Sequence, residues 1–321
     1  MKDRAVSTLA RPDRIPAILV VIFASVVGLA FVLPQWVMFL LTIAMAKAFV
    51  VLGLVILQRT GLVSFGQALY YCLGAYCAGA LSKFYAVTDV VVLMAAGGAA
   101  CLLLAAILGF LLANYRGIFF GLLSMALSMI LYGLLVKSQS LGSSDGFNML
   151  APTVFGYKPD TQGATRFLLL TVACGWGIVL TLLVHRYLKT PLGRLCEPIR
   201  DNEIRVEYMG ASVRNAIHVK YVIAAAVAGV GGALAGVTVG HIDPEMAYWT
   251  TSGEFVFIAI LAGTGSVAAP FLGALIYQSI YSAAYDLSPN TWQMVVGTSL
   301  LLDIVFLPTG LWSVFTRWKK A

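Results

Sequence analysis

The sequence predicts an all-α membrane protein, a polytopic helical bundle of about ten transmembrane or half-membrane helices. Of its 321 residues, 60% are hydrophobic and 11% are charged, whereas a soluble domain carries about 25% charged residues. One globular core cannot bury so much apolar surface, so lipid must solvate a large part of the chain. The apolar segments lie at roughly 15–33, 36–58, 62–82, 88–113, 117–136, 167–187, 218–240, 252–263, 267–286 and 291–315.

Basic residues lie at the ends of these segments and predict their orientation, because lysine and arginine accumulate on the cytoplasmic side of a membrane. We therefore expect the N-terminus, the polar stretch after the sixth segment and the C-terminus in the cytoplasm. The same placement explains the net charge of +7 without nucleic-acid binding. The residues concerned are Lys2, Arg4, Arg11 and Arg14, then Arg186, Lys189, Arg194, Arg200, Arg205, Arg214 and Lys220, and finally Arg317, Lys319 and Lys320.

This orientation leaves one stretch, about 251–285, that must leave and return on the same face. It is too short for two full spans of about 20 residues each with a turn. Gly263-Thr264-Gly265-Ser266 and Pro270 interrupt its middle. We expect two short helices that meet at a break, or a re-entrant hairpin. A second interruption runs from Gln58 to Gln67, where the chain re-enters the membrane.

Both interruptions are candidates for a path through the membrane, because irregular backbone at membrane depth is tolerated only inside protein or along a water-lined cavity. Glycine also permits close helix packing. The two interpretations stay open for each glycine, and packing is favoured for Gly74. The candidate path residues are Lys47, Ser64, Phe65, Gly66, Gln67, Gly263 and Gly265.

Lys47 lies in the middle of the second apolar segment. A charge at a helix centre costs about 2.5–3.5 kcal/mol on insertion scales. Lys47 therefore either pairs with Glu254 or Asp303 as a structural contact, or places positive charge beside a path used by an anionic or zwitterionic solute.

The polar stretch Thr190–Val213, TPLGRLCEPIRDNEIRVEYMGASV, lies between apolar segments. Its charges alternate in sign, and those from Arg194 to Asp201 follow helical spacing over about two turns. Leu195 and Ile199 fall on the other face, and Pro198 predicts a kink or the start of a second helix. We interpret residues 188–217 as a docking loop for another protein. The loop at 138–166 then lies outside, where it could receive something arriving from that side.

Enzymatic signatures are missing from the sequence. It contains no GxxxxGK[ST] phosphate loop, no HExxH and no GxSxG. The three histidines, His185, His218 and His241, form no ligand cluster. We expect no catalytic residue, no metal site and no cofactor bound by this chain.

Five stretches together resemble a known family, and they occur in the same order over about residues 40–285. The most specific runs from Gly193-Arg194 through Arg200-Asp201-Asn202-Glu203 to Met209-Gly210. The chain resembles the permease subunits of branched-chain amino acid ABC importers of the LivM type. The stretches are GLVSFGQALYYCLGAY, RGIFFGLLSMALSMI, SSDGF, TPLGRLCEPIRDNEIRVEYMGASV and ILAGTGSVAAPFLGALI.

The resemblance implies a single transmembrane permease domain over 1–321 in a bacterial inner membrane, with 188–217 as its coupling loop. It implies a second, homologous permease subunit, two cytoplasmic ABC ATPases that hold ATP and Mg, and a periplasmic solute-binding protein. The residues implied in ATPase docking are Gly193, Arg194, Glu197, Arg200, Asp201, Asn202, Glu203 and Gly210.

Departures from the family pattern leave the solute open. The family commonly has histidine where this chain has Gln67 and asparagine near Leu54, and Cys196-Glu197-Pro198 and Lys47 are unusual. The expected solutes are branched-chain or related amino acids or small carboxylates, with urea, amides or aromatic acids as the alternative. A stand-alone secondary transporter is a second alternative. An intramembrane enzyme, a third, would require Lys47, Glu254 and Asp303 to converge.

Overall fold

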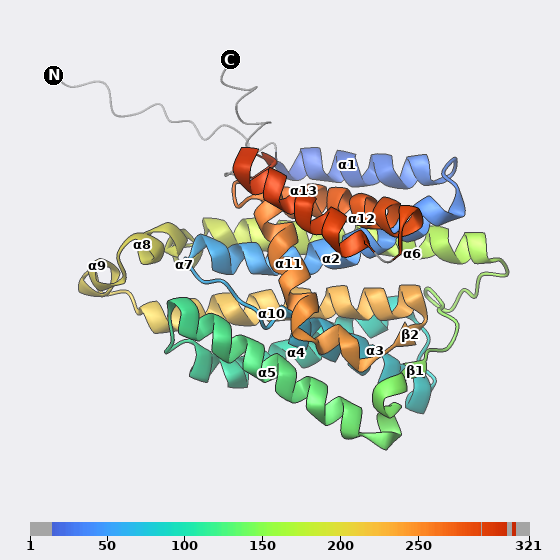
Figure 1. Cartoon of the computed structure of the whole chain (residues 1–321), viewed down its shortest axis with the longest axis horizontal. Helices are drawn as coiled ribbons and strands as arrows, with labels where there is room; N and C mark the ends of the chain where they lie inside the picture. The colour runs from blue at the N-terminus through green and yellow to red at the C-terminus, as the bar shows by residue number, and fades with distance from the viewer. Residues whose placement is uncertain (1–14, 290, 307–309, 313–321) are drawn as a thin grey trace, which may run out of the picture.

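The computed structural model describes residues 15–289, 291–306 and 310–312. Over these ranges the chain forms an elongated helical bundle, as predicted (Figure 1). Its longer helices are α1 (Ile15–Ala30), α2 (Gln35–Arg59), α3 (Gln67–Tyr85), α4 (Val90–Leu112), α5 (Gly117–Lys137), α6 (Gln162–Lys189), α10 (Val213–Val239), α11 (Trp249–Ala262), α12 (Ala269–Leu287) and α13 (Trp292–Phe306).

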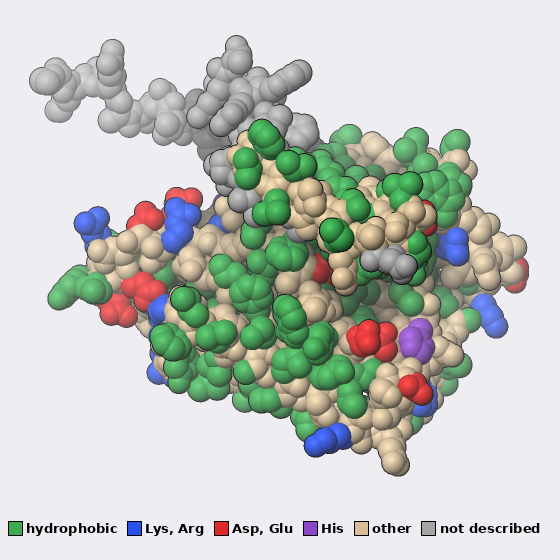
Figure 2. Space-filling model, in the orientation of Figure 1, with side chains coloured by type: hydrophobic (Ala, Val, Ile, Leu, Met, Phe, Trp, Pro, Cys, Tyr) green, Lys and Arg blue, Asp and Glu red, His purple; other side chains and the backbone are tan. Residues whose placement is uncertain are grey.

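Each of these helices coincides with one predicted apolar segment. Within the described residues, five helices are long and apolar enough to cross a membrane, namely α2, α4, α5, α6 and α10. The apolar side chains on α5 and on the outer face of α4 remain largely exposed, as those of Ile107, Ile118 and Phe119 illustrate. Figure 2 shows such hydrophobic side chains spread over one face of the bundle. Lipid or a second membrane protein must cover this surface.

Helix α10 is the centre of the bundle and packs against α2, α3 and α4 (Figure 1). Its backbone comes very close to α3: a Cβ built on Gly74 would lie 2.1 Å from the Gly229 carbonyl oxygen, and one on Gly232 would lie 1.8 Å from the Tyr71 carbonyl oxygen. Lipid is as apolar as a leucine side chain, so close van der Waals packing between small residues holds such helices together. The predicted packing role of Gly74 is confirmed.

The two ends of the bundle differ in structure. At one end, α6 continues into three short helices, α7 (Pro191–Arg194), α8 (Cys196–Asp201) and α9 (Glu203–Tyr208), on the left of Figure 1. We call this the docking end. The opposite end carries the 138–161 loop, with the 3-10 turns η1 (Gln139–Leu141) and η2 (Ser143–Asp145). There β1 (Phe147–Asn148) pairs antiparallel with β2 (His241–Ile242).

Two short helices do meet at a break within 251–285, as predicted: α11 ends at Ala262 and α12 begins at Ala269. We call residues 60–66 the first break and residues 263–268 the second break. Gly263 has φ +78°, a conformation that L side chains rarely adopt. A Cβ on Gly310 would lie 2.5 Å from the Gly263 Cα. Leu311 N donates to Leu261 O over 2.9 Å. The chain after α13 therefore returns to this break.

The expected cytoplasmic residues Lys2, Arg4, Arg11, Arg14, Arg317, Lys319 and Lys320 lie outside the described residues.

Replacing Gly232 by alanine should destabilise the bundle, because the added methyl group would meet the Tyr71 carbonyl oxygen. Overpacking of this kind costs about 1–3 kcal/mol. We expect a lower midpoint of thermal unfolding for the purified protein. Gly133→Ala in α5 is the matched control, because nothing lies within 4 Å of its added Cβ. Equal midpoints for the two variants would contradict the packing described for α10.

Candidate functional site

The sequence predicts a docking loop over residues 188–217. Its central part, residues 190–212, lies between α6 and α10, and we call it the docking segment. Side-chain caps start two of its three helices, α7 and α9. Thr190 Oγ1 accepts from Gly193 N over 3.2 Å at the start of α7, and Asn202 Oδ1 accepts from Arg205 N over 3.0 Å at the start of α9. Such caps satisfy amides that a helix start leaves open. Gly210, with φ +85°, then turns the chain toward α10.

The expected two-turn helix from Arg194 to Asp201 is instead divided, because α7 ends at Arg194 and α8 begins at Cys196. Pro198 lies in the first turn of α8, where its missing N–H has no partner to lose. This outcome matches the predicted start of a second helix.

The docking segment has one buried face and one exposed face. Cys196, Ile199 and Val206 point inward and are buried. Ile199 thus lies opposite the charges, as predicted, but it packs against this chain itself. The exposed face carries five of the predicted docking residues, and Gly210 is exposed beside it. These five are Arg194, Glu197, Arg200, Asp201 and Asn202.

The sequence analysis missed an apolar tip on this surface. The side chains of Ile204, Tyr208 and Met209 are 66%, 88% and 67% exposed. Figure 2 shows a hydrophobic projection beyond the charged side chains at this end. The available signal was the apolar pair at 204 and 208, one helical turn apart inside a charged stretch.

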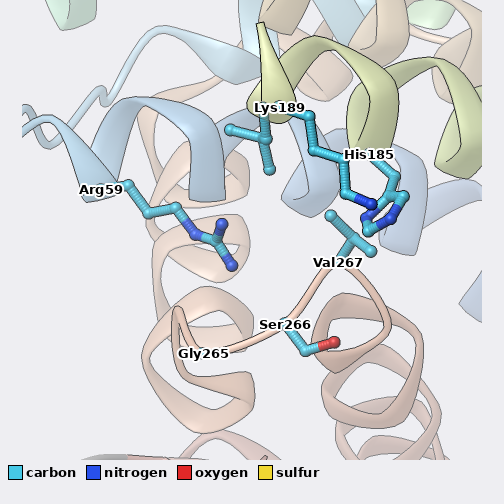
Figure 3. Close-up of a pocket in the computed structure, with 7 residues that line it drawn as sticks. Arg59, His185, Lys189, Gly265, Ser266 and Val267 are labelled. Carbon is cyan, nitrogen blue, oxygen red and sulfur yellow. The ribbon is translucent and has the colours of Figure 1, made fainter. Parts of the chain in front are cut away.

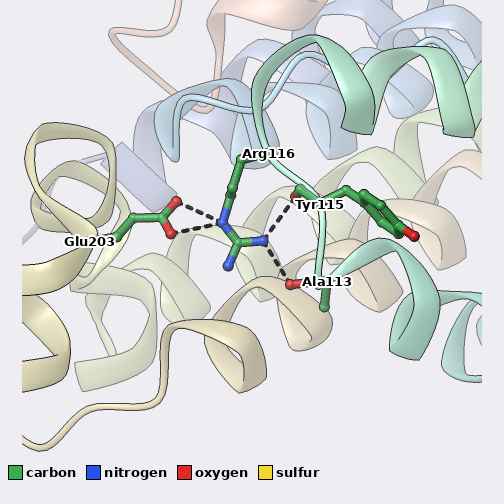
Figure 4. A network of polar contacts seen from close by, with 4 residues as sticks. All are labelled: Ala113, Tyr115, Arg116 and Glu203. Carbon is green, nitrogen blue, oxygen red and sulfur yellow. Dashed lines mark hydrogen bonds and ion pairs between the residues drawn. The ribbon is translucent and has the colours of Figure 1, made fainter.

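Two predicted docking residues have structural partners within the chain. Arg116 Nε donates to both carboxylate oxygens of Glu203, over 2.7 and 2.8 Å (Figure 4). Arg116 Nη1 also donates to the carbonyls of Ala113 and Tyr115, over 2.7 and 2.8 Å. Glu203 thus fastens α9 to the turn between α4 and α5. Gly193 is buried, and a Cβ there would lie 2.1 Å from the Tyr187 carbonyl oxygen.

The docking segment contacts the first break, and the first break is joined to the second. A Cβ on Gly61 would lie 3.0 Å from Arg200 Cγ, so the two segments touch. Arg59, the last residue of α2, donates from Nε to Thr264 O over 2.8 Å. The docking segment is therefore linked by direct contacts to the end of α2 and to the break after α11.

The first break reaches into the bundle, as predicted. Phe65 N donates to Ser124 Oγ over 3.1 Å, and Ser124 lies about 10 Å of helix rise beyond the start of α5. Ser64 is fully buried, and a Cβ on Gly66 would lie 2.7 Å from the Ser124 carbonyl oxygen. Gly66 therefore serves close packing, whether or not it also lines a path.

The second break lies beside the ends of two long helices, and the path role of Gly263 and Gly265 stays a prediction. Arg59 and Lys189, the last residues of α2 and α6, lie beside it. Arg59 is about 18 Å of helix rise beyond Lys47 at the middle of α2. The second break is therefore at the docking end of the bundle.

The irregular backbone that the sequence analysis overlooked is the 240–248 stretch. Ser128 Oγ donates to Ala247 O over 2.8 Å, and Ser128 lies about 16 Å of rise along α5. The chain thus enters from the opposite end through η3 (Pro244–Ala247), and α11 begins inside the bundle as a half-membrane helix. Gly240 and Pro244, directly after an apolar segment, were the signals.

Helices α3 and α11 begin side by side at this depth. Ala68 N, in the first turn of α3, donates to Ser252 Oγ in the first turn of α11, over 3.0 Å. Gln67 is fully buried, and neither polar atom of its side chain has a hydrogen-bond partner among the residues that the structure describes. An unpaired buried amide calls for an explanation, such as a ligand or an ion.

Lys47 forms an ion pair with Glu254 of α11, the first of the structural partners that the sequence suggested. The two side chains are 13% and 22% exposed. The Lys47 ammonium also lies 5.5 and 5.3 Å from the ring centroids of Tyr277 and Tyr281 on α12. The pair thus joins α2, α11 and α12. Asp303 is not part of it, and its Oδ2 lacks a hydrogen-bond partner within the described residues.

Lys47→Met should lower the free energy of unfolding by up to about 3 kcal/mol, because Glu254 then keeps a partly buried charge without a partner. The double variant Lys47→Met with Glu254→Leu should recover most of this loss. Thermal unfolding of the purified single and double variants measures both effects. A double variant that loses the sum of the two single effects would argue against the ion pair.

Arg116→Gln should release α9 from the α4–α5 turn. We expect faster amide hydrogen exchange over 203–208, by about fivefold for an ion pair worth about 1 kcal/mol at this exposure. Exchange followed by mass spectrometry measures it. Arg214→Gln is the control, since Arg214 lies at the same end without an ion pair to Glu203. Exchange that is equally fast in the control would contradict this role for Arg116.

Comparison with known proteins supports one family. Residues 36–305 match the family described as "Branched-chain amino acid transport system / permease component". The high-affinity branched-chain amino acid transport system permease protein LivM of Escherichia coli is 27% identical over 292 residues, which cover 82% of this chain and 67% of that protein. LivM of Salmonella typhimurium is 26% identical over 295 residues, 83% of this chain and 68% of that protein.

The permease protein BraD of Pseudomonas aeruginosa, from a high-affinity branched-chain amino acid transport system, is 31% identical over a shorter stretch of 133 residues. That stretch covers 41% of this chain and 42% of BraD. No solved structure matches the chain. Because the family match spans most of the bundle, from α2 to α13, the chain belongs to the permease component family of branched-chain amino acid transport systems.

Proposed function

We propose that this chain is the transmembrane permease subunit of a binding-protein-dependent ABC importer in a bacterial inner membrane. Its partners are then a second, homologous permease subunit, two cytoplasmic ABC ATPases that hold ATP and Mg, and a periplasmic solute-binding protein. In this proposal the docking end faces the cytoplasm, and both termini are expected on that side as well. The 138–161 loop faces the binding protein.

The construction of the docking segment carries the proposal. Its exposed face combines charges of both signs with the apolar tip of Ile204, Tyr208 and Met209. A central apolar cluster within a polar rim is the usual composition of a protein–protein interface. The chain contains no phosphate loop of its own. We therefore infer that a partner ATPase bound at this surface supplies the energy for transport.

The contacts behind the docking segment suggest how such a partner moves the helices. Arg200 touches the first break at Gly61, and Arg59 bonds the second break at Thr264. A push on the docking segment is thereby transmitted to α2 and α11, which the Lys47–Glu254 pair joins further inside. ATP binding on the partners would then favour one arrangement of these helices over the other.

The region where α3 and α11 begin supports a carboxylate-bearing solute. Helix N-termini carry partial positive charge, and broken helices in transporters direct such ends at anionic groups. The Gln67 amide next to this site has no partner among the described residues. We assign branched-chain or related amino acids or small carboxylates as solutes. Urea, amides and aromatic acids are the alternative.

A stand-alone secondary transporter is the second candidate, since broken helices suit it as well. Such a protein needs no motor subunit. The exposed apolar tip on the docking segment favours the importer, because a large apolar projection in water is otherwise unfavourable.

The double variant Tyr208→Ala with Met209→Ala should weaken ATPase binding by at least about tenfold, because buried aromatic and apolar residues dominate interface energies. Co-purification from membranes that contain the ATPases measures this loss. Tyr157→Ala is the control, since Tyr157 is exposed at the opposite end of the bundle. If no ATPase associates with the unaltered chain, the importer proposal fails and the secondary transporter takes its place.

The same reconstituted assembly identifies the solute. ATPase activity is measured with the binding protein and a panel of branched-chain, aromatic and dicarboxylic solutes, urea and short amides. Stimulation by a carboxylate-bearing solute supports the assignment, whereas stimulation by urea or amides alone would overturn it. Arg200→Ala with Glu203→Ala should keep solute binding but uncouple the stimulation.

A further inference from the structure

A basic pocket lies at the docking end, between the last residues of α2 and α6 and the second break. Its volume is about 180 Å3, several times the roughly 30 Å3 that one water occupies in the liquid. Arg59 enters from α2, and His185 and Lys189 enter from α6, above the loop that carries Gly265 and Ser266 (Figure 3).

Positive groups dominate this pocket. None of the described residues that line it is acidic. Glu197 of the docking segment attracts Arg59 from nearby but is not among the lining residues. Ser266 Oγ accepts from Ala268 N over 3.2 Å, so its hydroxyl hydrogen can point elsewhere. Two permanent cations, a histidine and a hydroxyl around one cavity form a set of donors suited to a phosphate group.

We propose that this pocket binds a phosphate-bearing anion, with the headgroup of an anionic phospholipid as the source that its position favours. The pocket lies where α2 and α6 end, and the side chains of Leu188 and Val267 add apolar surface to it. A Cβ on Gly265 would lie 3.0 Å from Cδ1 of Trp312, so an indole ring borders the site. Basic pockets between helices on the cytoplasmic side bind anionic headgroups, and tryptophan is enriched at membrane interfaces.

The bound anion would stabilise the contact between the breaks. Arg59 both lines the pocket and holds Thr264, while the first break beside it touches the docking segment. Phosphate bound here would contact Arg59 and Lys189 together and keep the α2 end against the second break. The lipid side of this inference rests on the proposed cytoplasmic orientation of the docking end.

The test uses the purified full chain in detergent and native mass spectrometry. The probes are phosphatidylglycerol, phosphatidylcholine as the neutral headgroup, and inorganic phosphate. Lys189→Gln should weaken binding of the anionic probe about fivefold, the factor that corresponds to about 1 kcal/mol per basic residue at a membrane surface. Arg186→Gln is the matched control, because Arg186 is exposed on the same turn of α6 and does not line the pocket.

Each outcome decides the proposal, and none depends on ATPase binding. Phosphatidylglycerol retained in preference to phosphatidylcholine, with loss in Lys189→Gln only, supports a lipid headgroup. Binding of inorganic phosphate with the same dependence on Lys189, but no lipid retention, supports the site with a soluble phosphate. Equal losses in the two variants, or no binding of either anionic probe, would overturn it. The unfolding midpoint of Lys189→Gln, measured in phosphatidylcholine, shows whether this variant is correctly folded.

Discussion

Close contact between helix backbones at α10 is the constraint on which the rest of the bundle depends. Glycines at 74, 229 and 232 let α3 and α10 approach until carbonyl oxygens occupy the space where side chains would begin. In lipid, apolar burial between helices contributes little, so such packing and a few polar contacts must hold the spans. Helices α2, α3, α4 and α10 thus form the closely packed centre of the bundle, and α11 and α12 pack on it through α2.

Polar contacts in this protein gather where the helices are interrupted. Arg59 closes the second break, Ser124 holds the first, and Ser252 and Ser128 hold the start of α11 and the stretch before it. Backbone groups that a broken helix leaves open need partners when water is absent. The same hydrogen bonds connect the docking end to the depth of Gln67. The contacts that satisfy the interrupted backbone therefore also join these elements to one another.

The ion pair of Lys47 and Glu254 illustrates how a charged residue in a span can be both structural and close to function. It satisfies two charges that lipid would penalise and ties α2 to α11. The aromatic rings of Tyr277 and Tyr281 add α12 to the same cluster. Any rearrangement of α11 against α2 must carry this pair along or break it. Its strength therefore opposes any rearrangement that separates these two helices.

Apolar segment lengths by themselves determined the helices, because a span must be long, apolar and continuous whatever it packs against. The charged stretch at 190–213 likewise identified the docking end, since its charges cannot enter lipid. Tertiary structure decided what each residue contacts. Lys220, expected among the cytoplasmic basic residues, is fully buried. Glu203, expected at the docking surface, forms an ion pair with Arg116 of this chain. How far each break, or the unforeseen 240–248 stretch, reaches into the bundle depends on how the helices tilt and on which helices pack beside them. A local sequence pattern contains neither kind of information.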